Sequence, residues 1–331
     1  MEQKVQYEHF LYGDGEEIAL NDVDFCVDRI IMLPKIRPHK LEKAVNLSID
    51  YCQLDYFKQK LLEKTCECYS LIYQLYKRGF FLFPDIKPFL KKEDANFFCY
   101  YFRKEVDGLD CFFRSVDNPY GFDKSLLKNA NEIDQMIEYG FLPSSIEYCL
   151  KYDVVDDLSN FDILEEEVKW SPFEWSINPD CYDYLSFAGY FGSIKCFKHL
   201  LMKGLNIYDN VFSMVVCSGC LELFHICQGS SFFDFNGLCK ASEYCHLSLL
   251  VFMIENGQDI IIKCENKSTP LHLAAANGHY CIVEYLVNQK AEINAKNEYN
   301  LIDKKMIPLF IVLLRMATLL LLNILFLIKP K

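Results

Sequence analysis

The chain is short of the residues and charges that several protein classes require. Its 331 residues include only 14 glycines, 11 prolines and 2 tryptophans, too few for collagen-like, low-complexity or turn-rich all-β architectures. The 34 basic residues are outnumbered by 46 acidic ones, so the formal net charge is −12. Because an acidic surface repels phosphate groups, we expect neither nucleic acid nor an anionic membrane surface as the partner.

A secretory signal is not apparent either. The first ten residues, MEQKVQYEHF, carry charges and no apolar stretch, which is unlike an exported leader. The 16 cysteines follow no regular framework, and in a chain that is not exported we expect them to be reduced thiols that pack as small apolar groups. The sequence therefore predicts a cytoplasmic protein.

Signatures of common catalytic sites are missing. The chain contains no HExxH, GxGxxG, P-loop or GxSxG motif. Cys217 and Cys220 form one CxxC pair, whereas a zinc site usually needs two pairs at suitable spacing. Ser218 and Gly219 between them read as an inter-helix turn, so structural cysteines are the favoured interpretation. We predict a protein that is not an enzyme and has no cofactor or metal.

A well-formed helical repeat is present at residues 268–296. Thr269 is a natural N-cap, and Pro270 fits the first helical turn, where its missing N–H costs nothing. Leu271 and Ala274 share one face at helical spacing, and Gly278 can end the helix in a left-handed conformation. A second apolar stripe follows at helical spacing, formed by Ile282, Val283, Leu286 and Val287.

This unit resembles an ankyrin repeat, whose signature is T-P-L-H-x-A in a period of about 33 residues. The resemblance implies that the Thr269 hydroxyl and the His272 ring brace the turn by hydrogen bonding, so we assign His272 a structural role rather than a metal or catalytic one. The residues that carry the repeat motif are Thr269, Pro270, Leu271, His272, Ala274 and Gly278.

Weaker copies of the unit precede it. Residues 238–260 align without a gap at a shift of 33 residues, although Cys245 replaces the glycine and the TPLH motif is lost. Residues 212–227 form a shorter unit, and residues 184–207 are again close to the pattern. We therefore predict about four repeats over residues 176–300, of which 266–298 is the best.

Residues 1–175 contain helical apolar patterns but no TPLH motif. The arrangement resembles a large group of protozoan ankyrin proteins, over about residues 60–300, in which a helical domain of unknown function precedes degenerate and then regular repeats. The prediction is an all-α chain: a helical N-terminal domain, with an ankyrin-like character left open, then an ankyrin solenoid, and last a hydrophobic tail at residues 301–331.

The resemblance implies a protein-interaction scaffold, because stacked helix pairs form a rigid groove edged by variable loops. Its partner would be a protein that the sequence does not identify. The loops that bound the best repeat supply the candidate partner-binding residues, which are Glu265, Asn266, Lys267, Asn297 and Tyr299.

The tail has two readings. Leu309–Ile328 is a 20-residue run with only Arg315 and Asn323 strongly polar, long enough to cross a bilayer as a single-pass C-terminal anchor. This reading would make the protein a membrane-tethered adaptor. Regrouping plausible codons one nucleotide earlier instead yields Leu-His-Cys-Ala-Ala-x-Asn-Gly-His, so a frameshifted repeat is the favoured hypothesis, with the shift near Asn300–Ile307.

Overall fold

In a computed structural model of the protein, most of the described residues lie in helices. In the part of the chain that it describes, every regular element is a helix, in agreement with the predicted all-α fold. The chain divides into two compact units, residues 1–205 and 206–331. The described residues are 27, 30–31, 41–51, 55–64, 69–89, 101–102, 130–161, 163, 167–171, 173–174, 181–228, 236–264, 267–277, 279–292 and 295.

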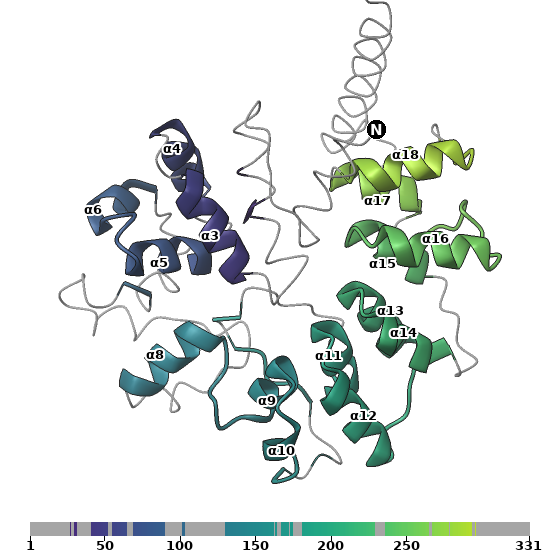
Figure 1. Ribbon diagram of the computed structural model, residues 1–331, viewed down its shortest axis with the longest axis horizontal. Helices are drawn as coiled ribbons and strands as arrows, with labels where there is room; N and C mark the ends of the chain where they lie inside the picture. The colour runs from purple at the N-terminus through teal and green to yellow at the C-terminus, as the bar shows by residue number, and fades with distance from the viewer. Residues whose placement is uncertain are drawn as a thin grey trace, which may run out of the picture. The chain divides into compact units, whose positions relative to one another are not determined.

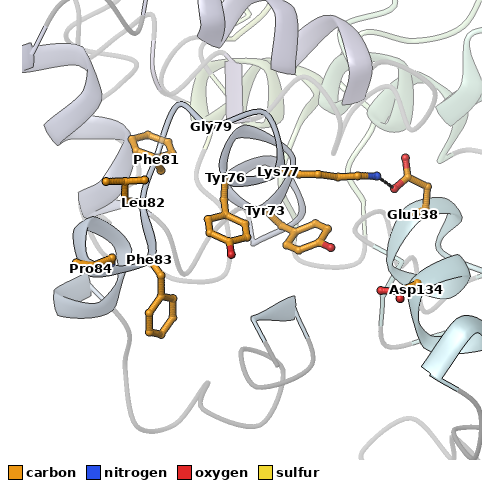
Figure 2. Close-up of a pocket in the computed structure, with 10 residues that line it drawn as sticks. All are labelled: Tyr73, Tyr76, Lys77, Gly79, Phe81, Leu82, Phe83, Pro84, Asp134 and Glu138. Carbon is orange, nitrogen blue, oxygen red and sulfur yellow. Dashed lines mark hydrogen bonds and ion pairs between the residues drawn. The ribbon is translucent and has the colours of Figure 1, made fainter. Parts of the chain in front are cut away.

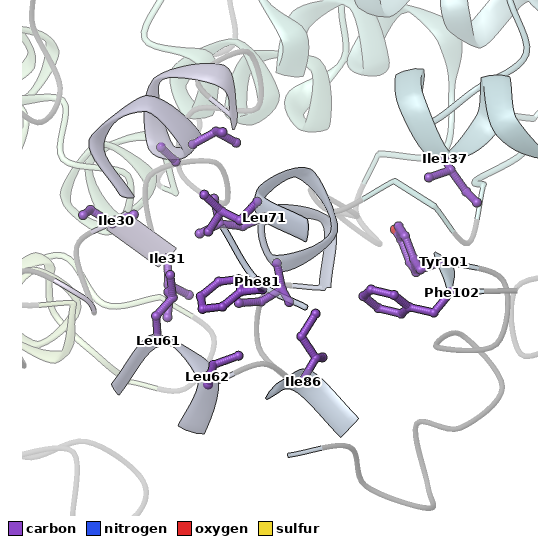
Figure 3. Packing of buried hydrophobic residues seen from close by; sticks show 14 of the residues in the cluster. Ile30, Ile31, Leu61, Leu62, Leu71, Phe81, Ile86, Tyr101, Phe102 and Ile137 are labelled. Atoms are coloured by element: carbon purple, nitrogen blue, oxygen red, sulfur yellow. The ribbon is translucent and has the colours of Figure 1, made fainter. Parts of the chain in front are cut away.

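The first unit begins with helices that share an apolar core. These elements are α3 (Leu41–Tyr51), α4 (Asp55–Glu63), α5 (Tyr69–Lys77), α6 (Phe83–Ile86), the 3₁₀ helix η3 (Lys87–Phe89) and α8 (Ala130–Tyr139). Leu61 from α4, Leu71 from α5 and Phe81 from the following turn are each at most 1% exposed and lie in one cluster (Figure 3). The helical spacing of leucines and aromatics in this region therefore marks faces that are buried against one another.

The rest of the first unit is built from two helix pairs. They are α9 (Ile146–Tyr152) with α10 (Val155–Leu158), and α11 (Tyr184–Phe191) with α12 (Ile194–Met202). Helix α11 packs against both α9 and α12, and α10 packs against α12. The first helices of the two pairs thus lie side by side, as in a stack of repeats.

The described part of the second unit contains three further helix pairs, coloured green to yellow in Figure 1. The pairs are α13 (Asp209–Ser218) with α14 (Leu221–Gln228), α15 (Gly237–Glu243) with α16 (Leu247–Glu255), and α17 (Pro270–Ala276) with α18 (Tyr280–Asn288). Each first helix packs against the next, α13 on α15 and α15 on α17. The four predicted repeats therefore correspond to the four helix pairs from α11 to α18.

The turn inside a helix pair has a recurring backbone. The first helix ends at a residue with positive φ, which is Gly192 (72°), Gly219 (71°) or Cys245 (60°). Glycine adopts this conformation without cost, whereas Cys245 accepts strain that a side chain normally avoids. Gly278, predicted to do the same in the best repeat, lies outside the described residues.

The pair α9–α10 has this same turn, although the sequence pattern placed the first repeat at residue 184. Asp153 follows α9 with φ 58°, and the Val154 N–H donates to the Cys149 carbonyl at 2.9 Å. The corresponding bonds in later pairs run from His246 to Ala241 and from His279 to Ala274, both at 2.8 Å. By its backbone, residues 146–158 form a repeat-like pair ahead of those that the sequence revealed.

The ends of the second helices also recur. After α12, α16 and α18 the chain turns through Gly204, Gly257 and Lys290, all with positive φ, and the next N–H donates to a carbonyl five residues back. Helix α5 ends in the same way, with Gly79 at φ 78° and the Phe80 N–H bonded to the Leu75 carbonyl at 3.0 Å. The boundary that we predict at 175/176 falls inside the first unit and stays a prediction.

Candidate protein-interaction surface

The TPLH segment forms a closed hydrogen-bonded cap at the start of α17. The Thr269 hydroxyl lies 2.8 Å from the His272 Nδ1 atom. The Thr269 backbone N–H donates to the same Nδ1 at 3.2 Å, and the His272 N–H donates to the hydroxyl oxygen at 3.4 Å. The structure thus places these two residues in the mutual brace that the resemblance implies, with Pro270 in the first turn.

The hydrogen bonds fix the protonation of the His272 ring. Since Nδ1 accepts from the Thr269 N–H, it carries no proton, and the neutral tautomer has its proton on Nε2. Burial lowers the pKa of His272, and a hydrogen bond to the Ala295 backbone opposes that shift. The ring therefore connects the first helix of the repeat to the loop that follows the second helix.

Another repeat caps the start of its first helix with different residues. In α11 the Asp183 carboxylate accepts from the Ser186 N–H at 2.8 Å and from the Ser186 hydroxyl at 2.8 Å. Asp183 and Ser186 stand where the best repeat has Thr269 and His272. The cap survives because it needs an acceptor at the N-cap and a polar partner three residues later, not one particular pair.

Buried histidines join successive pairs in the second unit. The Nε2 atom of His279, which is fully buried, donates to the Glu243 carbonyl of α15 at 2.8 Å. The Nε2 atom of His246 donates to the Cys217 carbonyl of α13, also at 2.8 Å. Each ring satisfies a carbonyl near a helix C-terminus that the helix itself leaves unpaired. These histidines therefore hold one repeat on the previous one.

The first unit makes the equivalent connection without histidine. The hydroxyl of Ser193, at the position of His246 and His279, donates to the Leu150 carbonyl of α9. The Asp153 carboxylate also accepts from the Cys196 N–H at 2.8 Å and so caps α12 from the preceding pair. Asp153, the first residue of the acidic run 153–167, therefore joins the two helix pairs.

Gly219 lies against one of these connecting rings. A Cβ atom at Gly219 would come within about 2 Å of the His246 ring, 1.9 Å from Cε1 and 2.1 Å from Nδ1. With its φ of 71°, the position requires glycine for two reasons, conformation and space. This explains the glycine in the Cys217–Cys220 motif without a metal.

Only one of the predicted partner-binding residues can be placed. Lys267 is exposed and has φ 53° in a turn in which its N–H donates to the Cys264 carbonyl at 2.8 Å and the Cys264 N–H donates to the Ser268 carbonyl at 3.0 Å. These two backbone hydrogen bonds join Cys264 to Lys267 and Ser268. Glu265, Asn266, Asn297 and Tyr299 lie outside the described residues.

Two apolar residues on the loops of the second unit were missed in the sequence. Ile261, in the loop before α17, is 52% exposed, and Tyr208, in the loop before α13, is 61% exposed. Large exposed apolar side chains on fixed loops are typical anchors of protein interfaces. A single isoleucine or tyrosine between two helical patterns gives no signal that separates it from a core residue.

Glu174, in the loop that follows α10, forms a buried ion pair with a residue of α9. The Lys151 ammonium lies 2.7 Å from the Glu174 carboxylate, with side-chain exposures of 4% and 0%. Lys151 also donates to the Tyr139 carbonyl at 2.9 Å and lies over the Phe191 ring. Burial lowers the pKa of Lys151, and the Glu174 charge opposes that shift. Glu174 is therefore part of the core of this unit.

A cavity of about 620 Å³ opens in the first unit between α5, the turn before α6, and α8 (Figure 2). The rings of Tyr73, Tyr76 and Phe83 line it, and Lys77 forms an ion pair with Glu138 on its rim. The hydrogen bond to Glu138 raises the pKa of Lys77. Asp134 also lies in the described lining.

Metal and membrane sites can be examined only where the structure describes the chain. Within those ranges, no group of three or more His, Cys, Asp or Glu side chains is arranged to hold a metal ion. No helix among the described residues has both the length and the apolar character that a bilayer crossing requires. The predicted anchor Leu309–Ile328 lies outside the described residues.

Comparison with known families supports the repeat assignment. Residues 185–297 match the family model for ankyrin repeats (3 copies), so this part of the chain consists of ankyrin repeats, which generally serve as protein–protein interaction modules. No curated protein matches the chain. The match starts at α11, so the pair α9–α10 and the helices before it are not covered, and the likeness of residues 1–175 to a protozoan helical domain stays a prediction.

Proposed function

We propose that the protein is a non-catalytic scaffold that binds a protein partner through the loops and groove of its ankyrin repeats. The observation that carries this proposal is the exposure of Ile261 and Lys267, both in the loop before α17. The Cys264 N–H donates to the Ser268 carbonyl, and a loop backbone that is ordered before binding loses less entropy on binding. The proposal places the protein in the cytoplasm.

The binding residues in this proposal are Glu265, Asn266, Lys267, Asn297 and Tyr299. To these the proposal adds Ile261 and Tyr208, which are 52% and 61% exposed, as apolar anchors. A mixture of charged and apolar side chains is the usual composition of a protein interface, with an apolar centre and a polar rim.

The test compares full-length chains that differ only at the surface. Affinity capture with the wild type should retain a partner that Ile261→Asp and Lys267→Glu each weaken at least tenfold. Met202→Asp is the matched control, because Met202 is 79% exposed at the end of α12 but lies on no loop before a first helix. Equal retention by all three variants would contradict binding through this turn.

A membrane-tethered adaptor is the second candidate, because Leu309–Ile328 is long and apolar enough to act as an anchor. A tagged full-length chain would then stay in the membrane fraction after carbonate extraction, and deletion of residues 301–331 would release it. Complete extraction of the full-length chain would reject the anchor and leave the scaffold proposal intact.

A further inference from the structure

Three tyrosines of the first unit lie together at the surface of α8 and α9. Tyr139 is the last residue of α8, and Tyr148 and Tyr152 stand four residues apart on α9. The ring centroids of Tyr148 and Tyr152 are 4.7 Å apart. The Tyr139 ring lies at 85° to Tyr148 and at 89° to Tyr152, with centroids 5.8 and 6.3 Å away. The three rings are in mutual contact, and we call them the tyrosine cluster.

The tyrosine cluster occupies a helix face that solvent reaches. Helix α9 buries Cys149 and Leu150 completely, whereas Tyr148 is half-buried and Tyr152 is 42% exposed. Tyr139 is 38% exposed. Polar side chains normally cover the solvent-facing side of a surface helix, so neighbouring exposed aromatic rings are typical of an interaction surface.

The rings are held in place by contacts within the chain. The Tyr152 hydroxyl donates to the Tyr139 carbonyl at 3.1 Å, and the Lys151 ammonium donates to the same carbonyl at 2.9 Å. These bonds tie the end of α8 to α9 beside the rings. Because ring contacts and hydrogen bonds already restrict the tyrosine side chains, they lose little rotamer freedom when a partner binds.

Two exposed carboxylates accompany the cluster on α10, which packs against α9. Asp156 and Asp157 are both exposed, and neither side chain forms an ion pair with any described residue. Burial raises the pKa of Tyr148, and the negative charge of Asp157 adds to that shift. The nearby Lys151 does not neutralise these carboxylates, because it is buried and paired with Glu174.

We propose that the tyrosine cluster, together with Asp156 and Asp157, is a docking surface for an arginine-bearing segment of a protein partner. A guanidinium group can stack on a tyrosine ring and donate to a carboxylate at the same time, because it is flat and has several N–H groups. A lysine ammonium has the same charge without the flat face. This proposal uses none of the ankyrin loop residues and does not depend on the proposed function.

The first test measures fluorescence anisotropy of a labelled peptide of alternating glycine and arginine, titrated with the full-length chain at physiological salt. We expect saturable binding that is about fivefold or more weaker for the matched peptide of glycine and lysine. The net charge of −12 attracts both peptides alike. Equal binding of the two peptides, or no saturable binding of the arginine peptide, would overturn the proposal.

The second test removes the two carboxylates. The chain with both Asp156→Asn and Asp157→Asn should bind the arginine peptide about fivefold more weakly, and its binding should depend less on salt. Both side chains are exposed and lack ion pairs with described residues, so the variant should keep the helical circular dichroism of the wild type. Unchanged affinity in this variant would contradict the proposal.

The third test removes one aromatic face. Tyr148→Leu keeps an apolar side chain without a ring and should weaken binding of the arginine peptide about threefold or more, whereas Tyr148→Phe should bind nearly as the wild type does. Tyr182→Leu is the matched control, because Tyr182 is 57% exposed in the loop before α11 and lies outside the cluster. Equal affinities of the two leucine variants would refute stacking on the cluster. If Tyr148→Leu loses its helical signal, the aspartate variant decides the outcome.

A final variant separates this surface from the ankyrin loops. Ile261→Asp weakens partner capture under the proposed function, but it should leave binding of the arginine peptide unchanged. Loss of peptide binding in Ile261→Asp would assign the peptide to the loops and overturn the present proposal. Failure of the tyrosine cluster leaves the proposed function to its own test.

Discussion

The pairs α17–α18 and α9–α10 share a backbone hydrogen bond after their first helices but have little sequence in common. Helix α17 starts after Thr269, an N-cap followed by proline, whereas α9 starts after Ser145, whose hydroxyl accepts from the Tyr148 N–H at 3.2 Å. After both first helices, the N–H of His279 or Val154 donates to the carbonyl five residues back. A repeat therefore needs a capped short helix and this closing hydrogen bond, while the full motif mainly makes it recognisable.

The two pairs differ in how they are fixed to the rest of the chain. The α17–α18 pair uses His279, a neutral group that bonds to the Glu243 carbonyl of the preceding repeat. In α9–α10 the matching residue is Val154, whose side chain makes no cap hydrogen bond, and the pair relies on the buried Lys151–Glu174 ion pair. The His279 site is polar but neutral, whereas the Lys151–Glu174 site is charged. Substitutions at the two sites should therefore lower the free energy of unfolding by different amounts.

The largest effect is expected for Glu174→Ala. It leaves the Lys151 ammonium buried without its partner, which should cost about 3–5 kcal/mol in the free energy of unfolding. Urea unfolding followed by circular dichroism measures this loss. Lys77→Ala, which breaks the exposed pair with Glu138, should cost less than about 1 kcal/mol. If the two variants lose equal stability, the ion pair does not fix this helix pair.

Gly219→Ala should have the next largest effect and lower the free energy of unfolding by about 2–4 kcal/mol. The added methyl group meets the His246 ring and the residue has a positive φ, so strain and a broken hydrogen bond add together. Gly204→Ala is the control, because it also has a positive φ but no atom within 4 Å of the new Cβ; it should cost only about 1–2 kcal/mol. A smaller loss for Gly219→Ala than for Gly204→Ala would show that the ring is not a constraint.

His279→Ala should cost about 1–3 kcal/mol, because the Glu243 carbonyl then has no partner in a buried site. Thermal unfolding measures the change. His225→Ala serves for comparison, since His225 is exposed and its ring bonds to Gln228, three residues away on the same helix; its effect should stay within about 0.5 kcal/mol. Similar losses for both variants would refute a connecting role for His279.

Thr269→Ala tests the cap that α17 and α9 share. Loss of the hydroxyl acceptor should cost about 1 kcal/mol, while Thr269→Ser, which keeps the oxygen, should lose less than half of that. Denaturant midpoints of the three chains provide the measurement. An alanine variant as stable as the wild type would mean that the Pro270 backbone alone starts the helix.

The smallest effect concerns pH. Because the pKa of His272 is lowered in the folded chain, the unfolded chain binds more protons, and stability falls as the pH drops below about 6.5. Above that pH the neutral His272 ring makes its full contribution to the stability of the folded chain. His272→Gln should remove this part of the acid sensitivity when unfolding is compared at pH 7.5 and pH 5.5. An unchanged slope in the variant would assign the sensitivity to other groups.

The sequence was most informative where helix spacing and capping residues coincide. Thr269, Pro270 and His272 indicated a capped helix because each has a local effect on the backbone. Ser145 indicated the start of α9 for the same reason. Asp153 gave no such indication, because its role depends on Cys196, which lies 43 residues further along the chain.

The sequence alone therefore determined the helical periods, the register of the repeats and the braced turn of α17, since all of these arise from interactions within a few residues. Only the tertiary structure decided that Glu174 is buried against Lys151, that Gly219 faces a ring and that His279 bonds to the Glu243 carbonyl. Those three depend on packing between residues more than 20 positions apart, and a side chain carries no local mark of the neighbour that it will meet.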